Sequence, residues 1–228
     1  GVTGIEFAAV PIASKRIAMT LRKQCDRRNL EPAGFCVGAE LLAPAAKQRQ
    51  AIAQLKHDVD IAAALGCKTM RHDVTQGFDA YKQYKGPKTF SAALKIVVPA
   101  IREVADYASK QGITTSLENH GFYMQASKRV VKLIETVDHD NFALTMDMGN
   151  FLCVNENPVD AVRHAVKRAV MVHAKDFHVR SKKKMPPQGW FATPTPIALR
   201  GAIVGHGVID IPAQLRLLDR AGYRGFLS

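Results

Sequence analysis

The stretch Phe142-Ala-Leu-Thr-Met-Asp147-Met-Gly-Asn150 decides the fold, because it joins a short apolar run to a carboxylate and a turn. Two other stretches have the same form, Ile113-Thr-Thr-Ser-Leu-Glu118 and Val170-Met-Val-His173. Each is typical of a buried strand that ends in a group able to bind a proton or a metal ion. Several such strands, separated by helical patterns, predict a parallel sheet with helical cover.

Outward from these strands, short apolar runs alternate with longer amphipathic ones along the chain. Helices are expected at residues 14–29, 45–65, 91–110, 127–137, 158–168 and 211–221. Strands are expected at residues 4–9, 34–41, 67–72, 113–118, 142–147 and 170–175, and a seventh strand begins at 225–228. A long loop is predicted over 177–207. In the last helix, Ile211, Leu215 and Leu218 are predicted to share one face.

This alternation fits either a doubly wound sheet or a (β/α)8 barrel that lacks one strand. A nucleotide-binding doubly wound sheet carries a glycine-rich phosphate loop after its first strand, and no such loop follows residues 4–9. The sequence therefore predicts an α/β protein of the (β/α)8 TIM barrel class. We expect residues 1–228 to form a single barrel domain.

Composition and charge narrow the functional classes. Of the 228 residues, 47% are hydrophobic and 23% are charged, which is typical of a globular protein. Neither an apolar run of about 18 residues nor a secretory signal is visible, so we expect no membrane partner. Four single cysteines, Cys25, Cys36, Cys67 and Cys153, are typical of reduced thiols in a cytoplasmic protein. The net charge of +12 favours anionic partners, although its scatter favours a solvated surface.

Glu118, Asp147 and His173 end three consecutive predicted strands, at the edge where a (β/α)8 barrel places its active site. A single acidic residue at a strand end is more often the N-cap of the next helix. Three such groups in register instead favour a metal site. Two carboxylates and one imidazole suit one divalent ion, which could be Mn²⁺, Mg²⁺, Co²⁺ or Zn²⁺.

These motifs resemble the xylose isomerase-like barrel superfamily, which holds sugar phosphate isomerases and epimerases, ketose 3-epimerases, inosose dehydratase and endonuclease IV. The matching stretches are Ser-Leu-Glu118-Asn-His-Gly, Thr-Met-Asp147-Met-Gly-Asn-Phe, Val-His173-Ala-Lys-Asp and Val204-Gly-His-Gly-Val-Ile-Asp210. The resemblance implies a divalent ion held by a Glu, an Asp, a His and a second Glu on the final strand. The first three match this chain, and the fourth would follow Ser228. Gly4-Ile-Glu-Phe matches the family's second strand, so we expect a barrel domain trimmed at both ends, without its first strand and the end of its last.

The same resemblance implies a metal-dependent isomerase or epimerase, or a related lyase. It would act on a keto-sugar, a sugar phosphate or a cyclitol by proton transfer alpha to a carbonyl. Glu118 is the expected acid/base, and Lys175 is a second catalytic candidate, which could bind a carbonyl oxygen or a phosphate. The candidate substrate-binding residues are His72, Asn119, His120, Asn150 and Arg200. Asn150 departs from the family pattern, since many relatives have a His there.

Two alternatives remain open. An endonuclease IV-like phosphodiesterase acting on damaged DNA is favoured by the positive charge and by His72. A trinuclear zinc site needs more His and Asp ligands, however, and Asn150 stands where one such His is expected. The second alternative is a barrel that binds sugars without catalysis. We therefore expect a small sugar substrate rather than nucleic acid, in a protein that could also form a homo-oligomer.

Overall fold

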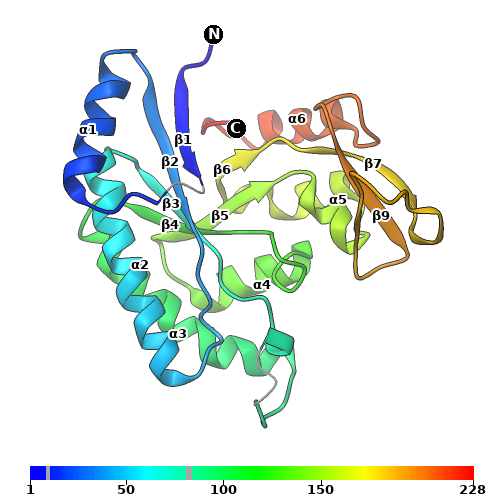
Figure 1. The fold of residues 1–228 in the computed structure, drawn as a ribbon, viewed down its shortest axis with the longest axis horizontal. Coiled ribbons are helices and arrows are strands. Elements are labelled where there is room, and N and C mark those ends of the chain that lie inside the picture. Colours follow the sequence, from blue (N-terminus) through cyan, green and yellow to red (C-terminus); the bar gives the residue numbers. More distant parts are fainter. Residues whose placement is uncertain (9–10, 81–83) are drawn as a thin grey trace. The chain divides into compact units, whose positions relative to one another are not determined.

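The computed structural model describes residues 1–8, 11–80 and 84–228 (Figure 1). These residues divide into two compact units. The first unit comprises residues 1–117 and 133–143, and the second comprises residues 118–132 and 144–228. Helices in this described part are all too short or too polar to cross a bilayer. Its four cysteines are free thiols, as the sequence predicts.

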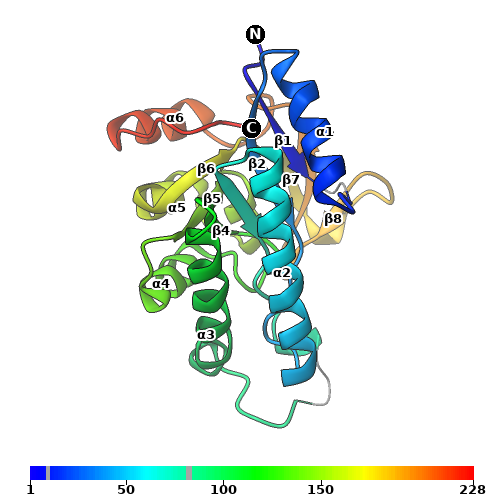
Figure 2. The same ribbon diagram turned by 90° about the vertical axis from the view of Figure 1, so that its left-hand side faces the viewer.

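The first unit repeats a strand, a helix and a parallel strand. Its strands are β1 (Gly4–Ala8), β2 (Glu31–Val37), β3 (Thr69–His72) and β4 (Thr114–Glu118), whose last residue belongs to the second unit. Each pairs in parallel with the next. The connecting helices are α1 (Lys15–Asp26), α2 (Ala45–Leu65) and α3 (Phe90–Ser109), with a short 3₁₀ turn, η1 (Phe78–Ala80), before α3. Figure 2 shows α1 and α2 in front of the strands they join. Two parallel neighbouring strands need such a crossover helix, because the end of the first strand and the start of the second lie at opposite edges of the sheet.

The boundaries of α2 show how local sequence forms these elements. The helix covers residues 45–65, as predicted, and buries Ile52, Leu55, Val59 and Ala62 on one face. It ends at Gly66, whose φ of 80° lies in the left-handed region that glycine adopts without strain. The first strand is confirmed over residues 4–8, and residue 9 of the prediction lies outside the described residues.

The second unit continues the parallel pattern. Strand β5 (Phe142–Asp147), which begins in the first unit, pairs in parallel with β6 (Ala169–His173). The helices of this region are α4 (Ser127–Val137), whose residues from 133 onward belong to the first unit, α5 (Pro158–Ala165) and α6 (Ile211–Arg220). Its 3₁₀ turns are η2 (Asn150–Val154) and η3 (Val166–Arg168). Near the end of the chain, Leu227 forms a parallel bridge with Val172, and Ala174 N–H donates to the Ser228 carbonyl at 2.7 Å. The chain thus begins a further parallel strand where the sequence predicts one.

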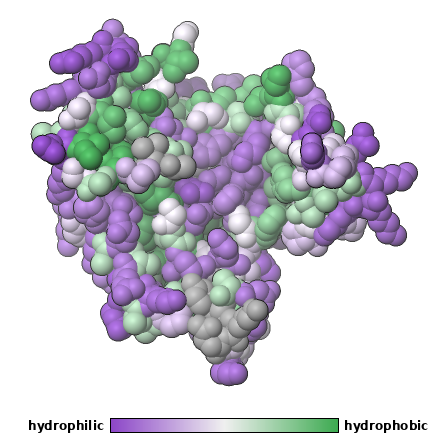
Figure 3. All heavy atoms as spheres, viewed as in Figure 1, coloured by the Kyte–Doolittle hydropathy of each residue, from purple (hydrophilic) through white to green (hydrophobic). Residues whose placement is uncertain are grey.

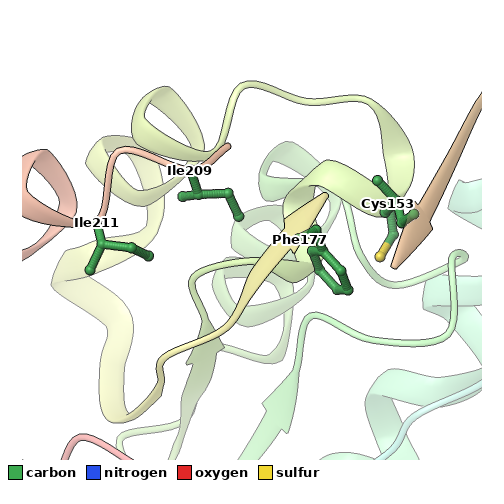
Figure 4. Packing of buried hydrophobic residues seen from close by; sticks show 5 residues of the cluster. Cys153, Phe177, Ile209 and Ile211 are labelled. Atoms are coloured by element: carbon green, nitrogen blue, oxygen red, sulfur yellow. The ribbon is translucent and has the colours of Figure 1, made fainter. Parts of the chain in front are cut away.

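The prediction of a long loop over residues 177–207 is wrong for most of that range. This segment contains an antiparallel sheet of β7 (Asp176–Ser181), β8 (Phe191–Ala192) and β9 (Ile197–Ala202), ordered β7-β9-β8, with the 3₁₀ turn η4 (Lys182–Lys184) after β7. One face of the sheet is apolar: Phe177 and Leu199 pack in a buried cluster with Cys153, Ile209 and Ile211 (Figure 4). The alternation of apolar and polar residues in β7 explains the strand, because alternate side chains point to opposite faces.

The predicted apolar face of α6 is also wrong at one position. Leu215 is 41% exposed, whereas the neighbouring Gln214 is completely buried. The Gln214 amide donates to the carbonyl of Met148 at 2.9 Å and to the carbonyl of Pro158 at 3.2 Å. The amide nitrogen of Gln214 is thus paired in the interior, whereas its Oε1 has no hydrogen-bond partner among the described residues.

Asp176 organises the segment between β9 and α6. Its buried carboxylate accepts four backbone N–H groups: those of Phe177 and Ile209 on Oδ1, and those of Gly205 and Gly207 on Oδ2. A Cβ atom at Gly207 would lie 2.1 Å from Asp176 Oδ1, so the close approach requires glycine. Asp176 ends the stretch Val-His173-Ala-Lys-Asp, but the sequence alone predicts no role for it.

We expect Asp176→Asn to lower the free energy of unfolding by about 1–3 kcal/mol, since an amide nitrogen would face N–H donors and leave them unpaired. Urea denaturation measures the change. The matched control is Asp210→Asn, because Asp210 caps α6 through the Ala213 N–H and asparagine caps helices equally well. Equal stability of the two variants would show that the carboxylate does not hold this turn.

Candidate metal centre

The ends of β4, β5 and β6 bring Glu118, Asp147 and His173 together in the second unit. Each is the last residue of its strand, and Asp147 pairs in register with His173. Each offers one potential ligand atom, and these atoms all lie within 4.8 Å of one another. Glu118 is 7% exposed and Asp147 is fully buried. Parallel strands place their carboxyl ends at one edge of the sheet, which explains this convergence.

The two carboxylate oxygens of Asp147 have different partners. Oδ1 accepts the backbone N–H groups of Gly149 at 2.9 Å and Asn150 at 2.8 Å, which shapes the turn after β5. Oδ2 is buried without a hydrogen bond of good geometry to any described residue, and the ammonium of Lys175 lies 2.6 Å away. Burial raises the pKa of the Asp147 carboxyl, and the nearby Lys175 charge opposes that rise. A buried carboxylate oxygen of this kind is suited to binding a cation.

Asn119 holds Asp147 through its backbone. The Asn119 amide donates to the Asp147 carbonyl at 2.9 Å, and its Oδ1 accepts the Asp147 N–H at 2.8 Å. The side chain is fully buried, so both of its polar atoms are engaged within the protein. The structure therefore gives Asn119 a positioning role, and its contact with substrate stays a prediction.

Asn150 links the acidic group to the lysine. Its Nδ2 donates to Glu118 Oε1 at 3.1 Å, and its Oδ1 accepts from Lys175 Nζ at 3.0 Å. Gln125 in turn donates to the Asn150 carbonyl at 2.6 Å. Sequence reasoning missed Gln125, because a single polar residue outside any strand end carries no signal in the sequence.

The donor set of this group fits a divalent cation. His173 Nδ1 lies 3.6 Å from Glu118 Oε1, so an imidazole nitrogen and two carboxylates face a common point. Oxygen and nitrogen ligands of this kind suit Zn²⁺, Mn²⁺ or Mg²⁺. Gly149 permits the arrangement, since a Cβ atom there would lie 2.6 Å from the Lys175 carbonyl oxygen. Ligation itself stays a prediction.

Two further residues that the sequence predicts to bind substrate are His120 and Arg200. His120 is exposed and follows β4 by two residues, where it forms an isolated bridge with Met124. Arg200 lies on β9 of the antiparallel sheet, beside Trp190. Substrate contact by either residue stays a prediction.

His72 belongs to the first unit, at the end of β3. It is completely buried, and its Nδ1 lies 2.8 Å from the Asp73 carbonyl oxygen. The Nε2 atom has no hydrogen-bond partner in the described part of the chain. The ring centroids of His72 and Phe142 lie 6.0 Å apart. Burial lowers the pKa of the imidazole below its ordinary value of 6.5.

This pKa shift predicts acid sensitivity. Below about pH 6.5 the unfolded chain protonates His72 while the folded chain does not, so stability falls as pH falls, by at most about 1.4 kcal/mol per pH unit. His72→Asn retains a donor for the Asp73 carbonyl and does not titrate, so we expect a shallower loss. Urea denaturation between about pH 7 and 5 measures the slopes. His206→Gln, which alters an exposed histidine, should keep the original slope; equal slopes for all three proteins would contradict the prediction.

Comparison with known proteins places this geometry in context. Residues 1–228 match the family described as xylose isomerase-like TIM barrel. The uncharacterized protein YihM of Escherichia coli K12 is 27% identical over 121 residues, which are 53% of this chain and 35% of YihM. An inosose dehydratase of Clostridium botulinum is 23% identical over 133 residues, which are 58% of this chain and 45% of the relative. The chain thus matches less than half the length of these relatives.

Solved structures share the fold over nearly the whole chain. The xylose isomerase domain protein of Planctomyces limnophilus has a TM-score of 0.75 and 19% identity, and covers 99% of this chain and 79% of its own. A xylose isomerase-like protein of Mycobacterium smegmatis, in complex with magnesium, has a TM-score of 0.72 and 18% identity (98% and 74%). A D-allulose 3-epimerase of Methylomonas has a TM-score of 0.72 and 19% identity (100% and 73%).

Proposed function

Because this chain belongs to the xylose isomerase-like TIM barrel family, we propose that it is a divalent-metal-dependent isomerase or epimerase. Its substrate is a keto-sugar, a sugar phosphate or a cyclitol, and the reaction moves a proton alpha to a carbonyl. The observation that carries this proposal is the convergence of Glu118, Asp147 and His173 within 4.8 Å at three strand ends. We place the enzyme in the cytoplasm, in keeping with its free thiols.

Glu118, Asp147 and His173 would hold the metal ion. When bound, the ion stabilises the negative charge that develops on the substrate oxygen as the alpha proton leaves. Asp147 suits this role because its Oδ2 is buried and its Oδ1 is already fixed by two backbone N–H groups. Asn119 keeps the backbone of Asp147 in place from both sides.

Glu118 is the acid/base group on one face of the substrate, and inversion of a carbon centre needs a second acid/base group on the other face, a role that the resemblance gives to the second Glu. Its Oε1 accepts the Asn150 amide, which orients the carboxylate, and the side chain is largely buried away from bulk water. A carboxylate in such a site is an effective base for a carbon acid, because few water molecules compete for it. Lys175, 40% exposed in its side chain, places a positive charge beside the same group and can bind a substrate oxygen.

The relatives support this class of chemistry. Inosose dehydratase and D-allulose 3-epimerase are named for reactions on a cyclitol ketone and a ketose, and the mycobacterial structure holds magnesium. Both kinds of substrate carry a carbonyl beside a carbon that bears a hydroxyl group. A proton on that carbon becomes removable only when the developing charge is stabilised.

Solvent deuterium exchange tests the proposal. Full-length protein is incubated in D₂O with a panel of ketoses, ketose phosphates and inosose, and uptake of deuterium is followed by NMR. We expect metal-dependent exchange with at least one of them, lost on chelation and restored by added metal. The panel is run beside abasic-site DNA. Metal-dependent DNA cleavage without deuterium uptake would favour the nuclease alternative, and binding of a sugar without exchange would favour a non-catalytic barrel.

A further inference from the structure

The antiparallel sheet carries a pocket that the candidate metal centre does not use. The pocket has a volume of about 450 Å³ and is lined by His178, Val179, Arg180, Pro186, Gln188, Trp190, Arg200 and Val208. We call it the arginine–tryptophan pocket. Its volume falls in the range of about 300–1,000 Å³ that is typical of small-molecule sites. Neither the candidate metal ligands nor Lys175 line it.

Strand register places the cationic residues on one face of the sheet. His178 of β7 pairs directly with Arg200 of β9, and Arg180 follows His178 by two residues. Because alternate residues of a strand share a face, these three side chains lie on the same side. The opposite face carries Phe177 and Leu199, which pack in the buried cluster. Hydrophilic side chains project from this end of the second unit, in purple at the right of Figure 3.

Both guanidinium groups of the pocket lie against the ring of Trp190. The Cζ atoms of Arg180 and Arg200 each lie 5.5 Å from the centroid of the indole ring, within the range of a cation–π contact. Asp and Glu are missing from the residues that line the pocket. Among the described residues, no carboxylate forms an ion pair with either arginine. Two cationic side chains therefore line one pocket without a counter-charge, which favours the binding of an anion there.

We propose that the arginine–tryptophan pocket binds the phosphate group of a small organic phosphate monoester. Guanidinium groups present paired N–H donors that match phosphate oxygens, and two of them balance a dianion. His178 and Gln188 add polar groups, whereas Trp190 and Pro186 supply an apolar wall for the organic part. This binding does not depend on the proposed reaction at the metal centre.

Trp190 is the only tryptophan of the chain, so its fluorescence reports on this pocket alone. At constant ionic strength, we expect a hexose 6-phosphate to change the emission in a saturable way, and the neutral hexose to leave it unchanged up to about 10 mM. Inorganic phosphate should compete with the monoester. Arg180→Gln and Arg200→Gln should each weaken binding by about tenfold or more, because each removes a charge-assisted hydrogen-bond donor.

Two control variants separate this site from other effects. Lys184→Gln removes an exposed charge of η4 outside the pocket and should bind the monoester as the wild type does. Glu118→Gln should also bind it fully, so that failure at the metal centre and failure here can be distinguished. The proposal is overturned if the neutral hexose binds equally well, or if both arginine variants keep full affinity while folded by circular dichroism. Tighter binding of a single-stranded oligonucleotide than of the monoester would likewise overturn it and assign the pocket to nucleic acid.

Discussion

Glu118→Gln is expected to lower the rate of alpha-proton exchange by about 10²–10⁴-fold, which is the usual contribution of a positioned general base. Glutamine keeps the size of the side chain, and its carbonyl oxygen can still accept the Asn150 amide that Glu118 Oε1 accepts at 3.1 Å. What it loses is the negative charge, and with it the ability to take a proton and part of its strength as a metal ligand, which is why the comparison is made at saturating metal. The rate is measured by deuterium uptake into the substrate that the panel identifies, at saturating metal.

The matched control is Glu103→Gln, which removes a carboxylate from an exposed ion pair with Lys56. Such surface pairs contribute about 0–1 kcal/mol to stability, so this variant should fold and exchange normally. If Glu118→Gln retains the wild-type exchange rate while binding metal, Glu118 is not the base. Loss of exchange with unchanged urea denaturation and retained metal binding would locate the defect in the proton transfer.

Asp147→Asn is expected to lower the affinity for a divalent ion by more than about 100-fold. Loss of an outer-shell partner alone typically costs about 10–100-fold, and here a direct ligand loses its charge. Binding to the folded state raises stability by about 2.7 kcal/mol at a ligand concentration of 100 Kd. Wild-type protein should therefore gain stability on addition of Mn²⁺, Mg²⁺ or Zn²⁺, and the variant should gain little. Thermal denaturation with and without each metal measures both.

Asp160→Asn provides the control for this experiment, because Asp160 is an exposed carboxylate in the first turn of α5 that pairs with Arg163. This variant should gain as much stability from metal as the wild type does. An equal gain in the Asp147→Asn protein would show that the ion binds elsewhere, and would remove the main support for the proposed chemistry.

Local periodicity explains how much of the fold could be predicted. The α2 boundaries at residues 45–65 and the β5 boundaries at 142–147 agree with the sequence prediction, because a helix repeats every 3.6 residues and a strand every two. The family match over the whole chain confirms the TIM barrel class. The strand-end positions of Glu118, Asp147 and His173 followed from the same patterns. Such patterns depend only on residues that lie close together in the sequence, so the sequence alone can indicate them.

The features that were missed depend on residues distant in the chain. The antiparallel sheet pairs residues 176–181 with 197–202, and no local pattern indicates this pairing because the two strands lie apart in the sequence. Gln214 is buried only because two distant carbonyls meet its amide. Lys175 lies against Asp147, and Asn119 clamps the same aspartate, through contacts that only the folded chain creates. Sequence by itself therefore determined the alternation of the parallel strands with helices and the types of chemical group at the ends of those strands. Tertiary structure alone decided which of those groups touch, because hydrogen bonds and ion pairs between distant residues exist only once loop closure has brought them within reach.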